Sequence, residues 1–231
     1  MEAAIKLKGI IFDLDGTLGN TLPICFTAFR CAFEKFLGRR YTDQEITALF
    51  GPTEEGIIEG LVPSQSQACL RAYLDEYERA HTLFCATIPG IETALRLLKQ
   101  SGTALAVVTG KGEHSAAISL QYLSLAHYFD NVFTGSSTGA IKPLAIQNVL
   151  SQWGISPHHV AYVGDSPYDI KAAKEVGVIP LGAAWAETTS YESLDEMAPV
   201  ATFRTVESFI DWIRYHVEGC GEEKGSGIGK V

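Results

Sequence analysis

Two aspartates that stand two residues apart are the first residues in the chain whose types and spacing could do chemistry. Asp13 and Asp15 lie in Asp-Leu-Asp-Gly-Thr, directly after the apolar run Leu7–Phe12. If that run is a strand, its two-residue period aims both carboxylates to one side. Carboxylates held so close repel each other unless one is protonated or a cation lies between them. The pair therefore predicts a cation or proton site, with a solvated turn as the plainer alternative.

A second pair of aspartates stands late in the chain. Asp165 and Asp169 lie in Gly-Asp-Ser-Pro-Tyr-Asp, with Pro167 between them. Proline favours the first position of a helix, so both acids are expected at a helix N-terminus, where the helix dipole favours negative charge. Ordinary capping explains one of these acids well and both together less well.

Thr109 and Lys142 complete a set that fits one chemistry. Thr109 ends the uncharged run Thr103–Val108, and Lys142 precedes a proline that opens a predicted helix. Each alone would be an ordinary surface residue. Oxygen-only ligands from the aspartates select a hard cation, Mg²⁺. One aspartate can attack phosphorus, a second can transfer the proton, and a hydroxyl and a lysine can hold the phosphoryl oxygens. Together these residues predict Mg²⁺-dependent phosphoryl transfer.

The elements that must position these residues alternate between strands and helices. Strands are predicted at Leu7–Phe12, Thr103–Val108, Asn131–Thr134, His159–Val163 and Val178–Leu181, with helices between them. This order predicts an α/β fold with a three-layer, Rossmann-like parallel sheet covered by helices on both faces. The polar motifs all follow strand ends, where open α/β sheets bind ligands.

A helical region interrupts this alternation after the first strand. Apolar side chains step by three and four from Leu22 to Phe36, which predicts an amphipathic helix. Further helical stretches follow as far as Phe84, broken at Gly51-Pro52 and at Pro63. No strand-like segment appears within this region, which predicts an inserted helical sub-domain.

In order and spacing, the motifs resemble those of the haloacid dehalogenase (HAD) superfamily over residues 5–216. The motifs are Asp13-Leu-Asp-Gly-Thr17, Thr109, Lys142-Pro143 and Gly164-Asp-Ser-x-x-Asp169. The helical insert looks like the α-helical cap of the subgroup that contains phosphoglycolate phosphatase and β-phosphoglucomutase. The resemblance implies a catalytic core at 1–17 and 88–217 and a cap at 18–87. The end of the chain at 218–231 is rich in glycine and has no apolar period, which predicts a flexible tail.

The resemblance also implies a role for each matched residue. Asp13 would be the nucleophile and a metal ligand, and Asp15 the acid/base whose main-chain carbonyl reaches the metal. Asp165 would be a further ligand with support from Asp169. Phosphate binding would fall to Thr109, Gly110 and Lys142, and substrate specificity to the cap loop that carries Gly51, Thr53 and Glu54. An ordinary helix–helix turn is the plainer alternative for this loop. Three residues depart from the pattern without removing a catalytic group: Asn20, Gly110 and Ala145.

The expected function is Mg²⁺-dependent hydrolysis of a small phosphorylated metabolite through an aspartyl-phosphate, as in phosphoglycolate phosphatase. The alternatives on the same fold are a sugar phosphomutase and an inorganic pyrophosphatase. More remote alternatives are a receiver-like signalling protein and a phosphoryl-binding protein without turnover. Lys111 and His114, which follow Thr109, are expected at a solvated helix N-terminus, with a position facing the substrate as the alternative.

Composition limits the partners. The chain has 231 residues, 18 Lys plus Arg against 27 Asp plus Glu, and a formal charge of −9. Such a balance argues against nucleic acid as a partner. No apolar run has the length of a membrane span, and no signal peptide is evident. Five scattered cysteines without a Cys-x-x-Cys motif indicate reduced thiols. We therefore expect a cytoplasmic protein, as a monomer or weak dimer.

Overall fold

The computed structural model describes residues 7–84 and 86–217. Its centre is a six-stranded parallel sheet in the order β3-β2-β1-β4-β5-β6. The strands are β1 (Gly9–Phe12), β2 (Ala104–Val108), β3 (Asn131–Phe133), β4 (Val160–Gly164), β5 (Ile179–Ala183) and β6 (Ala201–Phe203). The predicted fold class is confirmed. The predicted tail at 218–231 lies outside the described residues, as does the start of the predicted core before Leu7.

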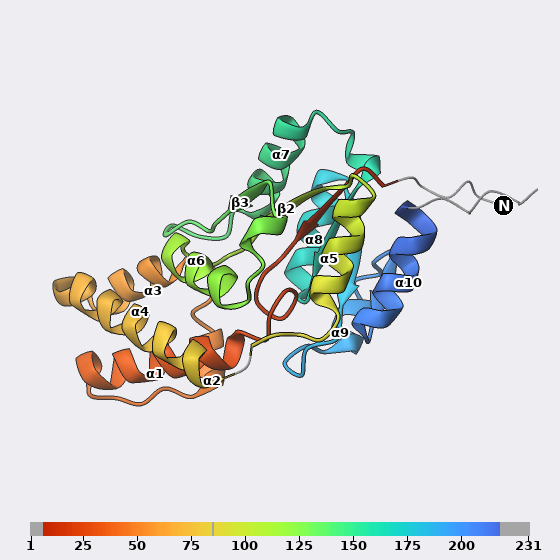
Figure 1. Ribbon diagram of the computed structural model, residues 1–231. Helices are drawn as coiled ribbons and strands as arrows, with labels where there is room; N and C mark the ends of the chain where they lie inside the picture. Colours follow the sequence, from red (N-terminus) through yellow and green to blue (C-terminus); the bar gives the residue numbers. More distant parts are fainter. Residues whose placement is uncertain (1–6, 85, 218–231) are drawn as a thin grey trace, which may run out of the picture.

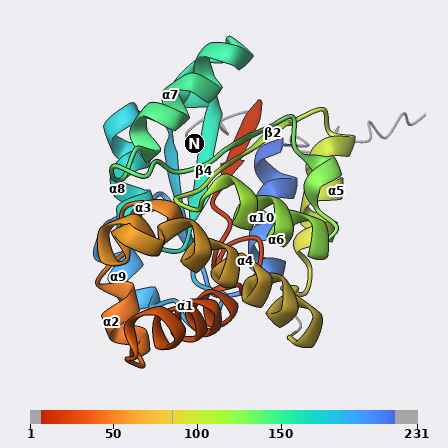
Figure 2. The ribbon, with the colours of Figure 1, turned by 90° about the vertical axis from the view of Figure 1, so that its left-hand side faces the viewer.

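Helices cover both faces of the sheet. One face carries α7 (Lys142–Trp153) and α8 (Pro167–Val176), and the other carries α5 (Ile91–Gln100) and α10 (Val206–Val217) (Figure 2). Alternation along β1 explains the two layers, because Ile11 packs into one apolar cluster and Ile10 with Phe12 into the other. α6 (Glu113–Tyr122) and α9 (Tyr191–Asp195) complete the core. The structure also contains three short 3₁₀ turns, at Pro63–Gln65, Ala126–Tyr128 and Pro157–His159.

In the part of the chain that the structure describes, four helices lie between β1 and α5. They form a helical insert, called the cap below, which lies beyond one end of the sheet in Figure 1. They are α1 (Leu22–Leu37), α2 (Asp43–Thr47), α3 (Glu54–Leu61) and α4 (Ser66–Leu83). α1 and α4 pack through a buried aromatic cluster in which the ring centroids of Phe29 and Tyr73 lie 4.5 Å apart. The chain enters and leaves the cap at neighbouring points, because Asn20 N–H donates to the Ala86 carbonyl over 2.8 Å.

The register places the ends of three strands side by side. Phe12 in β1 pairs with Val107 in β2 and with Val163 in β4. Asp13, Thr109 and Asp165, which follow these strands, therefore emerge at the same edge of the sheet. β1 and β4 also flank the point at which the strand order reverses, where open α/β sheets form their ligand crevice.

The elements after β5 are not among those predicted from the sequence. α9 and β6 have only five and three residues, too short for a visible period. α10 has 12 residues and a helical period of apolar side chains at Val206, Phe209, Ile210 and Ile213, so a helix could have been predicted there. Within the described residues, no helix is long and apolar enough to cross a membrane.

Candidate active site

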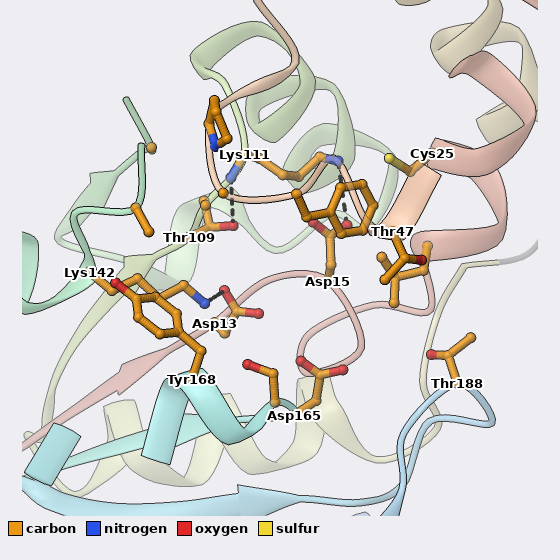
Figure 3. A pocket seen from close by; sticks show the side chains of 18 of the residues that line it. Asp13, Asp15, Cys25, Thr47, Thr109, Lys111, Lys142, Asp165, Tyr168 and Thr188 are labelled. Atoms are coloured by element: carbon orange, nitrogen blue, oxygen red, sulfur yellow. Dashed lines mark hydrogen bonds and ion pairs between the residues drawn. The ribbon is translucent and has the colours of Figure 1, made fainter. Parts of the chain in front are cut away.

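A cavity of about 820 Å³ lies between the cap and the carboxyl edge of the sheet. Asp13, Asp15, Thr109, Lys142 and Asp165 line its core side, as the sequence motifs predict (Figure 3). Gly51 and Glu54 also line it, together with Gly110. Thr53 is buried beside the cavity, where its N–H donates to the Ser136 carbonyl. The structure thus brings almost the whole predicted set around one space.

Lys142 joins two of the aspartates. Its Nζ lies 2.9 Å from Asp13 Oδ1 and 2.5 Å from Asp169 Oδ1. Burial would lower the pKa of Lys142, but the two carboxylates outweigh it and hold that pKa well above its ordinary value. Lys142 therefore stays charged at the edge of the sheet.

Asp13 is almost completely buried. Burial raises its pKa to about 7; Lys142 opposes this rise, and the neighbouring Asp169 and Asp15 add to it. The pKa of Asp165 is likewise well above its ordinary value, because of burial and then the charges of Asp13 and Asp169. Burial and mutual repulsion therefore disfavour the ionised forms of Asp13 and Asp165 unless a bound cation compensates their charge.

Asp169 holds the site together from the first turn of α8. Its Oδ2 accepts hydrogen bonds from Ser166 N–H and Oγ–H, and its Oδ1 accepts from Tyr162 Oη–H at 3.0 Å as well as from Lys142. The capping interpretation is therefore correct for Asp169, yet the same carboxylate also orients the lysine.

Gly16 lets the turn after β1 approach the other aspartates. Its φ of +76° lies in the left-handed region, and a Cβ at this position would stand 2.1 Å from Asp165 Oδ2. Any side chain here would displace Asp165.

A metal ion fits the donor set. Asp13, Asp165 and Asp169 each offer an oxygen within 4.8 Å of the others, and oxygen-only carboxylate ligands suit Mg²⁺. Because Asp169 already accepts several hydrogen bonds, Asp13 and Asp165 are the better placed ligands. The Asp15 side chain points elsewhere, since it accepts a short hydrogen bond from Thr21 and lies 3.4 Å from Lys111 Nζ.

The solvated position expected for Lys111 is wrong, whereas the alternative position facing the cavity agrees with its place in the lining. Lys111 is only 4% exposed, and its Nζ lies 3.2 Å from Glu54 Oε1 and 4.5 Å from the centre of the Tyr77 ring. Burial would lower its pKa, but Asp15, Tyr77 and Glu54 keep that pKa well above its ordinary value. Asp15 and Glu54 hold the Lys111 side chain inside the molecule. Both acids are far from Lys111 in the sequence, so the residues around Lys111 give no sign of this position. His114 is exposed, as expected.

Other contributing residues had no motif to mark them. Tyr162 lies in the middle of buried β4, and Thr189 donates from its Oγ1 to Asp165 Oδ2 over 3.1 Å. A buried tyrosine hydroxyl needs a hydrogen-bond partner, so the tyrosine within the apolar run of β4 could have indicated a polar group nearby. Thr189 lies in an irregular loop after β5 and gave none.

A family model described as haloacid dehalogenase-like hydrolase matches residues 10–183. The chain belongs to this family. It is 30% identical over 197 residues to a phosphoglycolate phosphatase of Neisseria meningitidis, covering 80% of this chain and 84% of the relative. It is 29% identical over 195 residues to a provisionally named pyrophosphatase, PpaX, of Clostridium perfringens, covering 84% and 91%. The fold is similar to that of a haloacid dehalogenase-like family hydrolase of Streptococcus pneumoniae, with a TM-score of 0.72, 23% identity, and coverage of 90% and 98%.

Family membership and phosphatase-named relatives identify this HAD protein as a phosphoric monoester hydrolase. The remote alternatives, a signalling receiver and a phosphoryl-binding protein without turnover, are thereby set aside.

Proposed function

We propose that this HAD protein hydrolyses a small-molecule phosphomonoester with Mg²⁺ and an aspartyl-phosphate on Asp13. The observation that carries the proposal is the placement of Asp13 in the cavity between Lys142 and Asp165. Asp13 and Asp165 would hold the ion, with Asp169 in support and the main-chain carbonyl of Asp15 as a further donor. The bound ion would supply positive charge against the phosphoryl oxygens.

The chain's own residues supply the remaining steps. A carboxylate oxygen of Asp13 attacks phosphorus, and the bond to the ester oxygen breaks as Asp15 donates a proton to the leaving alcohol. Asp15 then takes a proton from water, which attacks phosphorus and releases phosphate from Asp13. Lys142, the Thr109 hydroxyl and the Gly110 N–H stabilise the phosphoryl oxygens as charge builds.

Pyrophosphate hydrolysis is the second candidate, because several relatives are named PpaX pyrophosphatases. A sugar phosphomutase would use the same first step and return the phosphoryl group to sugar instead of water. Release of free phosphate, measured with 2-phosphoglycolate, pyrophosphate and a hexose 1-phosphate, separates the three.

The direct test of the nucleophile is Asp13→Asn. The amide has almost the same shape but cannot attack phosphorus, so turnover should fall by about a thousandfold or more. Circular dichroism should show an intact fold. Turnover near that of the wild type, with deamidation excluded by mass spectrometry, would reject Asp13 as the nucleophile.

We also propose that the protein works in the cytoplasm as a monomer or weak dimer. The free thiols of Cys25, Cys31 and Cys69 support a reducing compartment. The cap and the core of one chain together line the cavity, so no second subunit is needed to form it.

A further inference from the structure

The end of the cavity opposite Asp13 differs in chemistry from the phosphoryl end. Cap residues with apolar or weakly polar side chains form this surface: Leu22, Cys25, Phe26, Phe29, Phe50 and Ile57. The leaving group of a bound phosphomonoester must lie against them, because the phosphoryl group is held at the sheet edge.

Aromatic side chains make up much of this surface. The rings of Phe26 and Phe50 are stacked, with centroids 6.2 Å apart and planes within 5° of parallel. Phe50 nevertheless remains 40% exposed, so part of its ring is left for an occupant of the cavity. Apolar surface that the protein leaves uncovered inside a concave site is typical of ligand contact.

The charges that line the cavity leave no cation for a second anionic group. Among the described lining residues the cations are Lys111 and Lys142. Lys142 is assigned to the phosphoryl group beside Asp13. Lys111 is held between Asp15 and Glu54. Asp43 and Glu54 are the charged residues that the cap adds to the lining; both are acidic, and Asp43 is paired with Arg30, which lies outside the lining. A leaving group with a carboxylate or a second phosphate would therefore meet paired lysines and further acids.

The volume of the cavity also favours a larger leaving group than those of phosphoglycolate and pyrophosphate. A volume of about 820 Å³ lies within the range of roughly 300–1,000 Å³ that holds drug-sized ligands. Phosphoglycolate and pyrophosphate are small anions, each with two ionised groups, that would fill a minor part of it. Neutral hydroxyl groups at the cavity wall, from Thr47, Ser190 and Ser193, can bind uncharged polar substituents.

From this combination we propose that the preferred substrate is the phosphate monoester of an uncharged alcohol that carries an apolar ring. The inference rests on the proposed phosphatase function and specifies its substrate class. The ring lies against Phe26 and Phe50, and the single phosphoryl group supplies the whole negative charge that the site accommodates.

The test compares two esters of the same ring system, one of which carries an additional carboxylate. The full chain with Mg²⁺ is assayed for phosphate release from benzyl phosphate and from 4-carboxybenzyl phosphate, with 2-phosphoglycolate, pyrophosphate and acetyl phosphate alongside. We expect kcat/KM for benzyl phosphate to exceed those for 4-carboxybenzyl phosphate and 2-phosphoglycolate by about tenfold or more.

Two variants locate the preference. Phe50→Ala should lower the ratio of kcat/KM for benzyl phosphate to that for acetyl phosphate by about tenfold, mainly through KM. Tyr215→Ala removes a similarly exposed aromatic ring on α10 outside the cavity and should leave the ratio unchanged. Benzyl phosphate that is no better than its carboxylated partner, or a ratio unaffected by Phe50→Ala, would overturn the substrate class while acetyl phosphate is still hydrolysed. Absence of phosphate release from all five compounds, acetyl phosphate included, would instead overturn the phosphatase proposal itself.

Discussion

Glu54 of the cap accepts a hydrogen bond from the main-chain N–H of Gly112 in the core, with 2.6 Å between the atoms. Gly112 is the residue before α6, so a carboxylate from one part of the molecule caps a helix of the other. The same carboxylate accepts from Ser115 Oγ at 2.7 Å and lies beside Lys111. Burial would raise the pKa of Glu54, but Lys111, Ser115 and Gly112 outweigh it and hold that pKa below its ordinary value.

This contact changes the role expected of Glu54. Its carboxylate is engaged by the core and so is less suited to read the substrate directly. Glu54→Gln keeps the shape but removes the charge, and should lower the free energy of unfolding by about 1.5–3 kcal/mol. Urea unfolding measures the loss. Glu59→Gln, an exposed change on the same helix, should have no comparable effect. Equal stability of the two variants would contradict a stabilising role for the Glu54 contact.

Gly56 and Gly60 form a matched pair on α3. A Cβ at Gly56 would stand 2.2 Å from the Ser137 carbonyl oxygen of the core, whereas one at Gly60 would meet nothing within 4 Å. Gly56→Ala should therefore force the cap away from the core and lower stability by about 1–3 kcal/mol, together with kcat/KM. Gly60→Ala, one residue before the end of the helix, should stabilise by a few tenths of a kcal/mol up to about 1 kcal/mol, because alanine has a higher helix propensity than glycine. Urea unfolding and steady-state kinetics of both variants test this difference. If Gly56→Ala stabilises the protein as Gly60→Ala is expected to, the close approach of Gly56 to Ser137 is unimportant.

Mg²⁺ should stabilise the folded protein, because it compensates Asp13 and Asp165 in the native state alone. At Mg²⁺ about 100-fold above Kd, Tm should rise by about 5–10 °C. EDTA should stop phosphate release. Asp165→Asn should reduce the rise in Tm, while Asp75→Asn, an exposed change on α4, should retain it. Undiminished turnover in EDTA would argue against the proposed metal.

His81 should make stability sensitive to acid. Burial, aided by the charge of Lys111 and opposed by Asp15, lowers its pKa to about 4 from 6.5. Between these values the unfolded chain binds a proton that the folded chain does not, so stability is complete above about pH 6.5 and falls towards pH 4. The expected loss is roughly 1–3 kcal/mol.

The measurement compares wild type with His81→Gln by urea unfolding across this range of pH. Glutamine does not titrate, so the variant should lose less stability on acidification. His127→Gln, at an exposed position, should follow the wild type. Parallel curves for wild type and His81→Gln would remove His81 as a source of acid sensitivity.

The core of the site could be predicted because its residues lie at strand ends. Asp13, Thr109 and Asp165 each follow a short apolar run, and parallel pairing alone brings such ends together. The cap contacts could not be predicted in this way. Glu54 and Gly112 are 58 positions apart and meet only when the cap packs on the core. A local hint existed, since a lysine such as Lys111 directly before a helix opposes the helix dipole and needs an acidic partner.

The adjacent entry and exit of the cap, where Asn20 meets Ala86, bear on how the chain folds. β1 pairs with β2 across a long stretch of sequence, and closing a long flexible loop costs conformational entropy before the contact is rewarded. Once α1 and α4 have packed, however, the two ends of this stretch already lie next to each other. Early packing of the cap would thus hold the two ends of this stretch together. Less conformational entropy would then be lost when β1 pairs with β2, and the pairing would be faster.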